Sequence, residues 1–599
     1  MSNEGKTIFV CCDTGCLANN SMEIYNELKK IIEEENINAS VKTYVKPTGC
    51  KGLCEKGPVI KIKPDDISYF KVKISDARDI IEKTILKGEV IDRLLYYEPK
   101  LKKKVKSDKD IVFYNRQMKI ALRNVGETEP SNIEDYIQRG GFSALKKVLL
   151  NMKKEDIIPE IINSGLRGRG GAGFGTGRKW QQCARIDRFP KYVICNGDEG
   201  DPGAFMDRSI MEGDPYSVIE GMTICAFAVG SNLGFAYIRD EYNLAIRDMN
   251  KAINTAKEKG FLGNNILGSG FDFDIQIVRG GGAFVCGEST ALMSSIEGKV
   301  GEPRAKYIHS VEKGIWGQPT VLNNVETWAN VPVIIDKGSD WYNKIGTENS
   351  KGTKVFSLVG KVKNTGLVEV PMGITLRELI FDIGGGIIND KKFKAVQIGG
   401  PSGGCIPEEF LDLSVDFGSL KKADAMMGSG GIIIMDERTC MVDVARYYLD
   451  FLSKESCGKC VPCREGVKRM LEILTDICEG RGELEDIDSL LEIAETVQEA
   501  SLCSLGKSAP NPVISTIKYF KDEYVEHIIN KRCPAGVCKP ITTFFIDEDN
   551  CIGCDACKKE CAAGAILGEP KKKHKIDNDI CIRCGNCINI CKFNAVKVK

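Results

Sequence analysis

The sequence contains few histidines and no excess of either charge. Only three of its 599 residues are histidine, so few hydrolytic sites that depend on histidine are possible. The 83 acidic residues balance 83 basic ones, which argues against binding to nucleic acid or to an anionic membrane. No apolar run approaches the length of a membrane span, and the first residues lack the apolar core of a signal peptide. These absences predict a soluble, cytoplasmic protein with no nucleic-acid partner and no membrane span.

Cysteine, in contrast, is abundant. The chain has 26 cysteines, many of them at short and regular spacings. In a small secreted protein such a number would indicate disulfides, whereas in a large chain without a secretion signal it indicates metal ligation. The length suggests about four domains.

The stretch 165–180, GLRGRGGAGFGTGRKW, is rich in glycine with arginine and lysine interleaved. Glycine lets backbone N–H groups approach a bound phosphate or a flat ring, because no Cβ intervenes. Gly168, Gly170 and Gly173 fit G-x-G-x-x-G, but the residues before them favour a helix, so this is no ordinary dinucleotide fingerprint. A flexible linker is disfavoured, since linkers are serine-rich. The stretch predicts a site for a nucleotide-like cofactor.

A second candidate region is the acidic loop NGDEGDPGAF, residues 196–205. Strands and helices alternate from about 113 to 342, which predicts a parallel sheet covered by helices. The apolar strand 192–195 runs directly into the loop, and ligands of such sheets bind beyond the carboxyl ends of strands. The loop carboxylates are suited to ribose hydroxyls or a ring N–H. The alternative is an Asp/Gly turn on the surface.

The first cysteine set lies in the N-terminal hundred residues. Cys11 and Cys16 are followed by Cys50 and Cys54, and the spacings C-x4-C and C-x3-C suit a [2Fe–2S] cluster. Cys12 can replace Cys11, and spacing alone favours Cys11. A redox-active disulfide is disfavoured because neither pair is C-x-x-C. With its phrase GCKGLCEKGP, this segment resembles the thioredoxin-like [2Fe–2S] ferredoxins.

The second set lies in a region that is helical by periodicity, about residues 437–529. Cys457, Cys460 and Cys463 follow C-x2-C-x2-C, and Cys503 comes some forty residues later. Three close thiolates and one remote thiolate suit a [4Fe–4S] cluster. Zinc is disfavoured, since tetrahedral zinc sites usually use two separated pairs.

The last sixty residues contain two runs of C-x2-C-x2-C-x3-C, the signature of a two-cluster bacterial ferredoxin. The fourth cysteine of each run ligates the other cluster. The predicted sets are therefore Cys551, Cys554, Cys557 and Cys591, and Cys581, Cys584, Cys587 and Cys561. Ala562 and Lys592 replace the usual proline after each run. Proline is not a ligand, so cluster binding is expected to survive.

Cys533 and Cys538, in RCPAGVC, precede the ferredoxin region. His527 lies just upstream and Cys440 is a fourth candidate, so the four predict a zinc site, with inert thiols in a hinge as an equal alternative. We interpret the other seven cysteines as packing residues; they are Cys12, Cys183, Cys195, Cys225, Cys286, Cys405 and Cys478.

Nearly all of residues 124–506 resemble the flavin- and NADH-binding subunit of respiratory complex I. The phrases that carry this resemblance are the glycine stretch, the acidic loop, YIRDEY, GGGAFVCGEST, GQPTVLNNVET and ESCGKCVPCREG. The resemblance implies a Rossmann-like domain that holds FMN, with NADH stacked on the flavin. The implied FMN residues are Gly168, Arg169, Gly170, Gly171, Lys179, Asn196, Asp198, Asn323, Asn324 and Thr327. The implied NAD(H) residues are Phe174, Glu199, Asp201, Glu241 and Lys306, and Tyr237 joins the cofactor-binding set.

The chain departs from that family at several positions. Gly175 replaces the proline of the usual FPTG, and the acidic pair is Glu199 and Asp201 in place of two glutamates. Gln182 and His309 stand where two aromatics flank the adenine. These departures leave the choice between NADH and NADPH open and do not disturb the flavin assignment.

The predicted fold is multidomain, α/β and α+β. The expected parts are a thioredoxin-like [2Fe–2S] domain (1–98), a charged linker (99–112), a Rossmann-like FMN and NAD(H) domain (113–342), a β-grasp (SLBB) domain (343–432), a helical bundle with a [4Fe–4S] cluster (433–530), a hinge with the candidate zinc site (531–542) and a two-cluster ferredoxin domain (543–599). The β-grasp part shows no catalytic constellation.

Four cysteine sets imply one [2Fe–2S] and three [4Fe–4S] clusters. Clusters pass single electrons, whereas a flavin takes two electrons from NADH and releases them one at a time. The fusion of these domains, with the phrase CNGDEGDPGAFMDR, resembles the β subunit of electron-bifurcating, ferredoxin- and NAD-dependent [FeFe]-hydrogenases. That family implies a hetero-oligomer with a hydrogenase catalytic subunit and a small [2Fe–2S] subunit, and exchange with soluble ferredoxin.

Other functions remain open at this point. Close relatives of that family serve NADP-reducing hydrogenases and NAD-dependent formate dehydrogenases. An electron-transfer scaffold without flavin activity is a different class, and the intact glycine stretch and the phrase NNVET argue against it. No motif for a hydrogen-activating cluster is found, so H2 chemistry would belong to another subunit.

Overall fold

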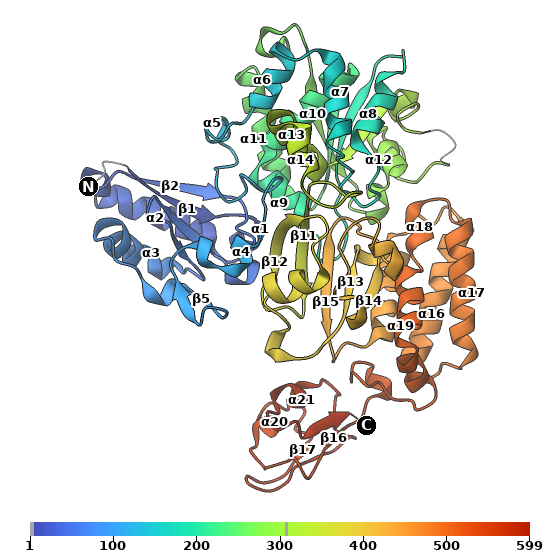
Figure 1. Ribbon diagram of the computed structural model, residues 1–599. Coiled ribbons are helices and arrows are strands. Elements are labelled where there is room, and N and C mark those ends of the chain that lie inside the picture. The colour runs from blue at the N-terminus through green and yellow to red at the C-terminus, as the bar shows by residue number, and fades with distance from the viewer. Residues whose placement is uncertain (1–4, 306–308, 599) are drawn as a thin grey trace. The chain divides into compact units, whose positions relative to one another are not determined.

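The computed structural model describes residues 5–305 and 309–598 and divides into two compact units (Figure 1). The first unit holds residues up to 390, together with 398–400 and 409–434. The second holds 391–397, 401–408 and everything from 435 onward. No helix in the described ranges is both long enough and apolar enough to cross a membrane.

The first unit begins with a four-stranded sheet in the order β2-β1-β3-β4. Its strands are β1 (Lys6–Cys11), β2 (Thr43–Thr48), β3 (Ile60–Lys63) and β4 (Ile67–Tyr69). β1 pairs parallel with β2 and antiparallel with β3. α1 (Thr14–Leu17) follows β1, and α2 (Ser21–Glu34) buries residues such as Ile24, Leu28 and Ile31, because their spacing places them on one helical face. The short helix α3 (Ala77–Asp79) follows β4.

Residues 99–112, expected to be a linker, contain regular structure. β6 (Lys103–Val105) pairs antiparallel with β5 (Tyr96–Glu98), and α4 (Val112–Asn115) follows. Asp108 lies 2.6 Å from the Nζ of Lys61. The charges that suggested a solvated linker therefore include one in an ion pair with the N-terminal sheet, and composition alone does not reveal such a partner.

The centre of the first unit is a parallel sheet in the order β10-β7-β8-β9. Its strands are β7 (Tyr192–Gly197), β8 (Leu233–Arg239), β9 (Asp274–Gly280) and β10 (Thr320–Asn324). In the register, Asn196 is adjacent to Asn324 on one side and to Tyr237 on the other. Because all four strands run the same way, these three residues meet at the carboxyl edge of the sheet.

Helices cover this sheet (Figure 1). They are α5 (Ile133–Gln138), α6 (Ser143–Leu150), α7 (Lys154–Asn163), α8 (Thr176–Ala184), α9 (Met206–Gly213), α10 (Pro215–Val229), α11 (Asn243–Glu258), α12 (Ser289–Ile296), α13 (Val325–Lys337) and α14 (Ser339–Asn343). α10 and α13 are almost wholly buried and pack on each other. Trp180 and Trp328 stack at 5.9 Å inside this core.

A second group of strands follows in the first unit. β11 (Thr353–Gly360) pairs antiparallel with β12 (Gly366–Pro371) and parallel with β15 (Gly431–Asp436). The first six of the eight residues of β11 are buried, so both faces of the strand are covered over that length. Such a strand lies inside its sheet.

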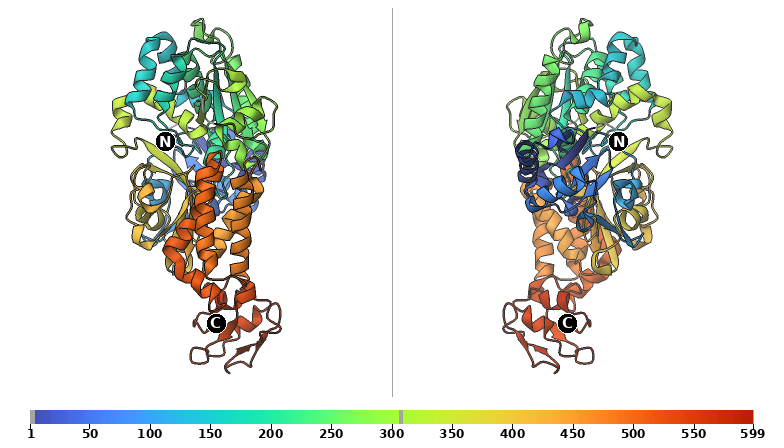
Figure 2. Two further views of the ribbon diagram at one scale, coloured as in Figure 1. Left: turned by 90° about the vertical axis from the view of Figure 1, so that its right-hand side faces the viewer. Right: turned by 90° about the vertical axis from the view of Figure 1, so that its left-hand side faces the viewer.

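The second unit contains β13 (Phe393–Ile398), β14 (Gly404–Pro407) and a bundle of helices that run alongside one another (Figure 2). The helices are α15 (Met441–Glu455), α16 (Val467–Cys478), α17 (Glu485–Ala500), α18 (Ser504–Ser508) and α19 (Asn511–Ile528). Apolar residues at helical spacing, such as Met470, Ile473 and Ile477 of α16, fill the bundle.

The chain ends in a small domain of two short helices and two strand pairs. Its elements are β16 (Phe544–Ile546), α20 (Ala556–Lys559), β17 (Ile566–Leu567), β18 (Lys575–Ile576), α21 (Asn586–Ile590) and β19 (Val596–Val598). β16 pairs with β19, and β17 pairs with β18, both antiparallel. The apolar core is small and includes Phe544, Ile566 and Val596 together with cysteines.

Candidate functional site

The glycine stretch forms a tight loop between α7 and α8. The N–H of Gly168 donates to the carbonyl of Phe174 at 2.8 Å. Gly171 has φ +113°, and a Cβ there would lie 3.2 Å from a backbone carbon of Gly428. A side chain at Gly170 would meet Asn324 at 3.0 Å. Only glycine therefore allows this loop to lie so close to its surroundings.

Arg169 holds this loop in place. Its backbone N–H donates to Thr327 Oγ1 at 2.9 Å. Its guanidinium donates to four protein acceptors, which are the carbonyls of Arg167, Lys351 and Thr353 and the hydroxyl of Tyr342. The side chain is 1% exposed. Arg169 is one of the FMN residues that the resemblance implies, and its guanidinium is committed to acceptors within the protein.

Lys179 and Asn323 lie together beside this loop. Lys179 Nζ donates to the carbonyl of Leu322 at 2.6 Å and reaches Asn323 Oδ1 at 3.3 Å. Burial lowers the pKa of Lys179 to about 8. Asn323 is 3% exposed, and its Nδ2 has no hydrogen-bond partner within the described residues. A buried donor without a partner is costly, by about 1–3 kcal/mol, so this pair fits a bound group that accepts hydrogen bonds.

The acidic loop after β7 is organised by its own side chains. Asn196 donates from Nδ2 to the carbonyl of Gly287 at 3.0 Å and accepts the N–H of Asp198 at 3.0 Å. Glu199 accepts the backbone N–H groups of residues 206–208, at the start of α9, and also the hydroxyl of Tyr242. Burial raises the pKa of Glu199. Glu199 therefore caps α9, a role that its place in the sequence did not indicate.

Three charged residues of this region escaped the sequence analysis. Asp207 accepts a hydrogen bond from Asn324 Nδ2, and burial raises the pKa of Asp207 well above its usual range. Glu326 forms a fully buried ion pair with Lys354 at the start of β11. The phrases MDR and NNVET contain the two acids, but nothing in the sequence places Lys354 beside them.

The strands after residue 343 also contribute a residue. Ser429 Oγ donates to Asp201 Oδ2, and burial raises the pKa of Asp201 to about 6. A Cβ at Gly400 would lie 2.8 Å from the Asp201 carboxyl carbon. The sequence showed no catalytic constellation in the β-grasp part, and the structure places its Ser429 in contact with the acidic loop.

The other expected NAD(H) residues differ in exposure and in their partners. Phe174 is 49% exposed on the glycine loop. Glu241 is exposed and pairs with Arg239 at 3.1 Å. Tyr237 is fully buried and donates to Ser295 Oγ at 3.0 Å. Lys306 lies outside the described residues.

The N-terminal cysteines meet in one hollow. Cys11, Cys16, Cys50 and Cys54 line it together with Asp13. Cys12 instead belongs to the apolar core formed by β1, β3 and α2. The alternation of side chains along β1 thus separates the two neighbouring cysteines, and the geometry favours Cys11 as the ligand.

The remaining iron-ligand candidates gather as the spacings predict. Cys463 is buried, which raises its pKa to about 11, and it interacts electrostatically with Cys457, Cys460 and Cys503. In the last domain one hollow is lined by Cys551, Cys554, Cys557 and Cys591, and a second by Cys561, Cys581, Cys584 and Cys587. The structure therefore places the fourth cysteine of each run with the other run.

Cys440, His527, Cys533 and Cys538 converge in the second unit. All four are buried, and their ligand atoms lie within 4.8 Å of one another. His527 Nε2 is 3.3 Å from Cys440 Sγ, while its Nδ1 is 2.7 Å from the carbonyl of Glu523. A histidine that is oriented through one nitrogen and presents the other is typical of zinc sites. Cys478, expected to be a packing residue, lies next to the group near Cys538.

Five family models match successive parts of the chain. They are "Thioredoxin-like [2Fe-2S] ferredoxin" over 1–84, "Nuo51 FMN-binding domain" over 161–333, "SLBB domain" over 355–406, "NADH-ubiquinone oxidoreductase-F iron-sulfur binding region" over 443–527 and "4Fe-4S dicluster domain" over 539–595. The predicted fold class is confirmed, and FMN-binding, [2Fe–2S] and [4Fe–4S] domains are present.

Relatives match over most of the chain. The HndC subunit of the NADP-reducing hydrogenase of Solidesulfovibrio fructosivorans is 52% identical over 481 residues, which are 80% of this chain and 98% of that protein. An F-type NADH-quinone oxidoreductase subunit of Rhizobium meliloti is 45% identical over 415 residues, 69% of this chain and 99% of that protein. The crystal structure of an NAD+-reducing [NiFe]-hydrogenase in the H2-reduced state aligns with TM-score 0.62 at 26% identity, covering 87% of this chain and 84% of that one. The chain therefore belongs to the family of NADH- or NADPH-oxidising flavin iron–sulfur subunits of the hydrogenase and complex I type.

Proposed function

We propose that the protein is the NAD(P)H-handling flavin subunit of a cytoplasmic, multimeric [FeFe]-hydrogenase that also exchanges electrons with ferredoxin. One observation carries the proposal, namely that a flavin-type loop and four separate cysteine sets occur in one chain. The similarity to HndC over 80% of the chain supports a hydrogenase as the partner. Electron bifurcation at the flavin is the finer part of the proposal.

The residues around the glycine loop would hold FMN. Asn323 supplies the buried donor without a partner, and Gly170 and Gly171 keep the loop free of side chains where a Cβ would collide. Lys179, with its lowered pKa, lies within reach of the same amide and would face the anionic part of the cofactor. FMN, when bound, supplies the conversion between two-electron and one-electron transfer.

Asn196, Asp198, Asn324 and Thr327 would complete the flavin site as the resemblance implies. Asn196 and Asn324 are neighbours in the sheet register at its carboxyl edge, which is where ligands of such sheets bind. Gly168, Arg169 and Thr327 are assigned a supporting role, because Thr327 accepts the N–H of Arg169 and the guanidinium anchors the loop.

The nicotinamide nucleotide would lie against Phe174 and the acidic loop. Asp201 and Glu241 would lie on its ribose side, and Glu199 would lie behind them as the cap of α9. Phe174 is exposed on the loop and offers an aromatic face. Lys306 and Tyr237 complete the residues that the resemblance implies. The name of the HndC hydrogenase refers to NADP, whereas the family resemblance implies NAD(H). We therefore propose that the nucleotide is NAD(H) or NADP(H).

The cysteine sets would hold one [2Fe–2S] and three [4Fe–4S] clusters, and Cys440, His527, Cys533 and Cys538 would hold zinc. A Cys3His set within 4.8 Å matches a closed tetrahedral zinc site, which is structural when no position is open. Zinc at this point, just before the ferredoxin domain, would fix the start of that domain on the helical bundle. The four ligands come from the N-cap of α15, from α19 and from the segment after α19.

The test is anaerobic purification from the native host, with mass spectrometry of every chain that co-purifies. We expect a chain with a hydrogen-activating cluster and a small [2Fe–2S] chain, and H2-dependent reduction of NAD+ or NADP+ that is coupled to ferredoxin. A formate-oxidising molybdenum or tungsten partner would refute the hydrogenase assignment. Uncoupled activity would refute bifurcation alone.

A matched pair of variants tests the flavin site itself. Asn323→Ala should lower the flavin content and weaken FMN binding, because it removes the buried donor. The exposed Asn151→Ala, at the end of α6, is the control and should keep the flavin content unchanged. A preparation of the unaltered chain that holds all clusters but no flavin would instead support the electron-transfer scaffold.

A further inference from the structure

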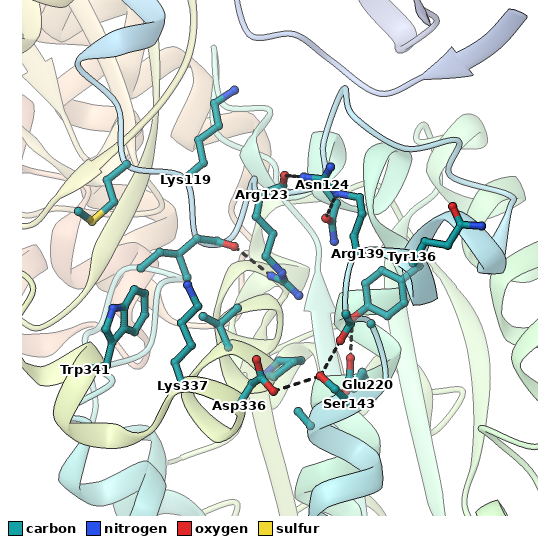
Figure 3. Close-up of a pocket in the computed structure, with 18 residues that line it drawn as sticks. Lys119, Arg123, Asn124, Tyr136, Arg139, Ser143, Glu220, Asp336, Lys337 and Trp341 are labelled. Atoms are coloured by element: carbon teal, nitrogen blue, oxygen red, sulfur yellow. Dashed lines mark hydrogen bonds between the residues drawn. The ribbon is translucent and has the colours of Figure 1, made fainter. Parts of the chain in front are cut away.

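A hollow of about 700 Å³ lies in the first unit, separate from the glycine loop. We call it the α13 hollow, because the last turns of α13, from Pro332 to Lys337, form one of its walls (Figure 3). The other walls are formed by residues 118–124, the end of α5, the start of α6 and Trp341 of α14. Thr327, beside the glycine loop, stands at the first turn of α13. A helix of 13 residues is about 20 Å long, so the hollow lies at the far end of α13 from the proposed flavin site.

Basic side chains dominate this lining. They are Lys119, Arg123, Arg139 and Lys337. None of the four forms an ion pair with a carboxylate in the described part of the chain. The whole protein has as many acidic as basic residues, so a shortage of acids does not explain these unpaired charges. Four cations around one hollow repel one another unless an anion joins them.

The two carboxylates in the lining accept hydrogen bonds from the protein, and Glu220 also attracts Arg123 electrostatically. Glu220 is 1% exposed and accepts the hydroxyl of Tyr136 and the N–H groups of Phe142 and Leu145. Asp336 accepts a hydrogen bond from Ser143 at 3.2 Å. Lys119 Nζ lies over the Tyr114 ring, so the cations that remain are Arg123, Arg139 and Lys337, and with the two carboxylates they give a net charge of +1.

Three of the cations are held in position. Arg139 donates from Nε to Asn124 Oδ1 at 2.9 Å and from Nη2 to the carbonyl of Arg123 at 3.1 Å. Arg123 Nη1 donates to the carbonyls of Ile120 and Ala329 at 2.9 and 3.0 Å. Lys337 Nζ lies 4.4 Å from the centre of the Trp341 ring, a cation–π contact. Figure 3 shows Arg123 and Lys337 extending into the space between Trp341 and Glu220, while Lys119 points away from that space. Positioned cations bind an anion with less loss of side-chain entropy.

We propose that the α13 hollow binds a small organic phosphate. A phosphomonoester carries about −1.5 to −2 charges at pH 7, so Arg123, Arg139 and Lys337 attract it more strongly than they would a monocarboxylate. The carbon skeleton would lie on the apolar wall formed by Ile120, Pro332 and Val333. The volume falls in the range of small-molecule sites, about 300–1,000 Å³.

Calorimetric titration of the full-length, flavin-loaded protein with ribose 5-phosphate tests the proposal. Saturating NAD+ is kept in both solutions so that the proposed nucleotide site is filled. We expect saturable binding of ribose 5-phosphate and none of ribose, because the phosphate supplies the attraction. Lys337→Ala and Arg123→Gln should each weaken binding by about tenfold or more, the loss of one charge-assisted contact.

Lys344→Ala is the matched control, since Lys344 is an exposed lysine just after α14 that does not line the hollow. It should leave the affinity unchanged. Lys337 is exposed, so its replacement keeps the test valid even if Arg123→Gln disturbs folding. The absence of binding to the unaltered protein, or equal binding by Lys337→Ala, would overturn the proposal. Equal binding of ribose would also overturn it.

Discussion

Removal of Lys354 alone should destabilise the flavin domain strongly. The side chains of Lys354 and Glu326 are 0% and 1% exposed, and each also bonds to the backbone of Val355. Asp207 is buried next to them and interacts electrostatically with both. Lys354→Met would leave the Glu326 charge buried without its cation. Breaking one side of such a pair costs about 3–5 kcal/mol.

Thermal unfolding of the flavin-loaded chain, followed by flavin release, measures this loss. For a domain of this size each kcal/mol lowers Tm by about 2–4 °C, so Lys354→Met should lower it by about 6–20 °C. Lys363→Met breaks an exposed pair with Asp390 and should lower Tm by less than about 4 °C. The double variant Lys354→Met/Glu326→Gln should recover most of the loss. A single-variant shift no larger than that of Lys363→Met, or no recovery in the double variant, would refute the reasoning.

Three further predictions concern the metals and the acidic loop. His527→Ala should lose zinc, measured by metal analysis, with the iron content unchanged; a chain that never contains zinc contradicts the assignment. Cys591→Ser should remove the same cluster signal in electron paramagnetic resonance as Cys551→Ser, and loss of the other cluster would show that the ligands do not cross. The pKa of Asp201 is raised to about 6 in the folded state, so its contribution to stability is present below about pH 4 and is lost as pH rises through 6. Asp201→Asn should therefore stabilise the protein more at pH 7 than at pH 4, by about 3 kcal/mol at most, and a pH-independent effect on Tm would contradict this.

The cysteine spacings carried most of what the sequence could predict. Thiolate ligands of one cluster must converge within a few ångströms, and short spacings such as C-x2-C impose that convergence locally. The crossed sets of the last domain were predictable for the same reason, because the run occurs twice. The glycine stretch was predictable because a close backbone approach requires glycine at fixed positions.

The sequence could not predict contacts between distant segments. Lys354 and Glu326 are 28 residues apart, and Ser429 and Asp201 are 228 apart, so no local pattern joins them. The four internal acceptors of the Arg169 guanidinium include Tyr342, Lys351 and Thr353, which lie more than 170 positions away in the sequence. The capping of α9 by Glu199 is a local contact, but it depends on α9 beginning at Met206, a boundary that the sequence did not predict.

The sequence by itself determined the order of domains, the cysteine sets and the kind of cofactor, since each rests on residue types at short, fixed spacings. Only the tertiary structure decided which polar groups of the site are already engaged and which remain for a ligand. It also brought Cys440, His527, Cys533 and Cys538 within reach of one another, and it placed Arg123, Arg139 and Lys337 around the α13 hollow. These outcomes depend on long-range packing, where the partner of a charge or a thiol is set by the whole fold.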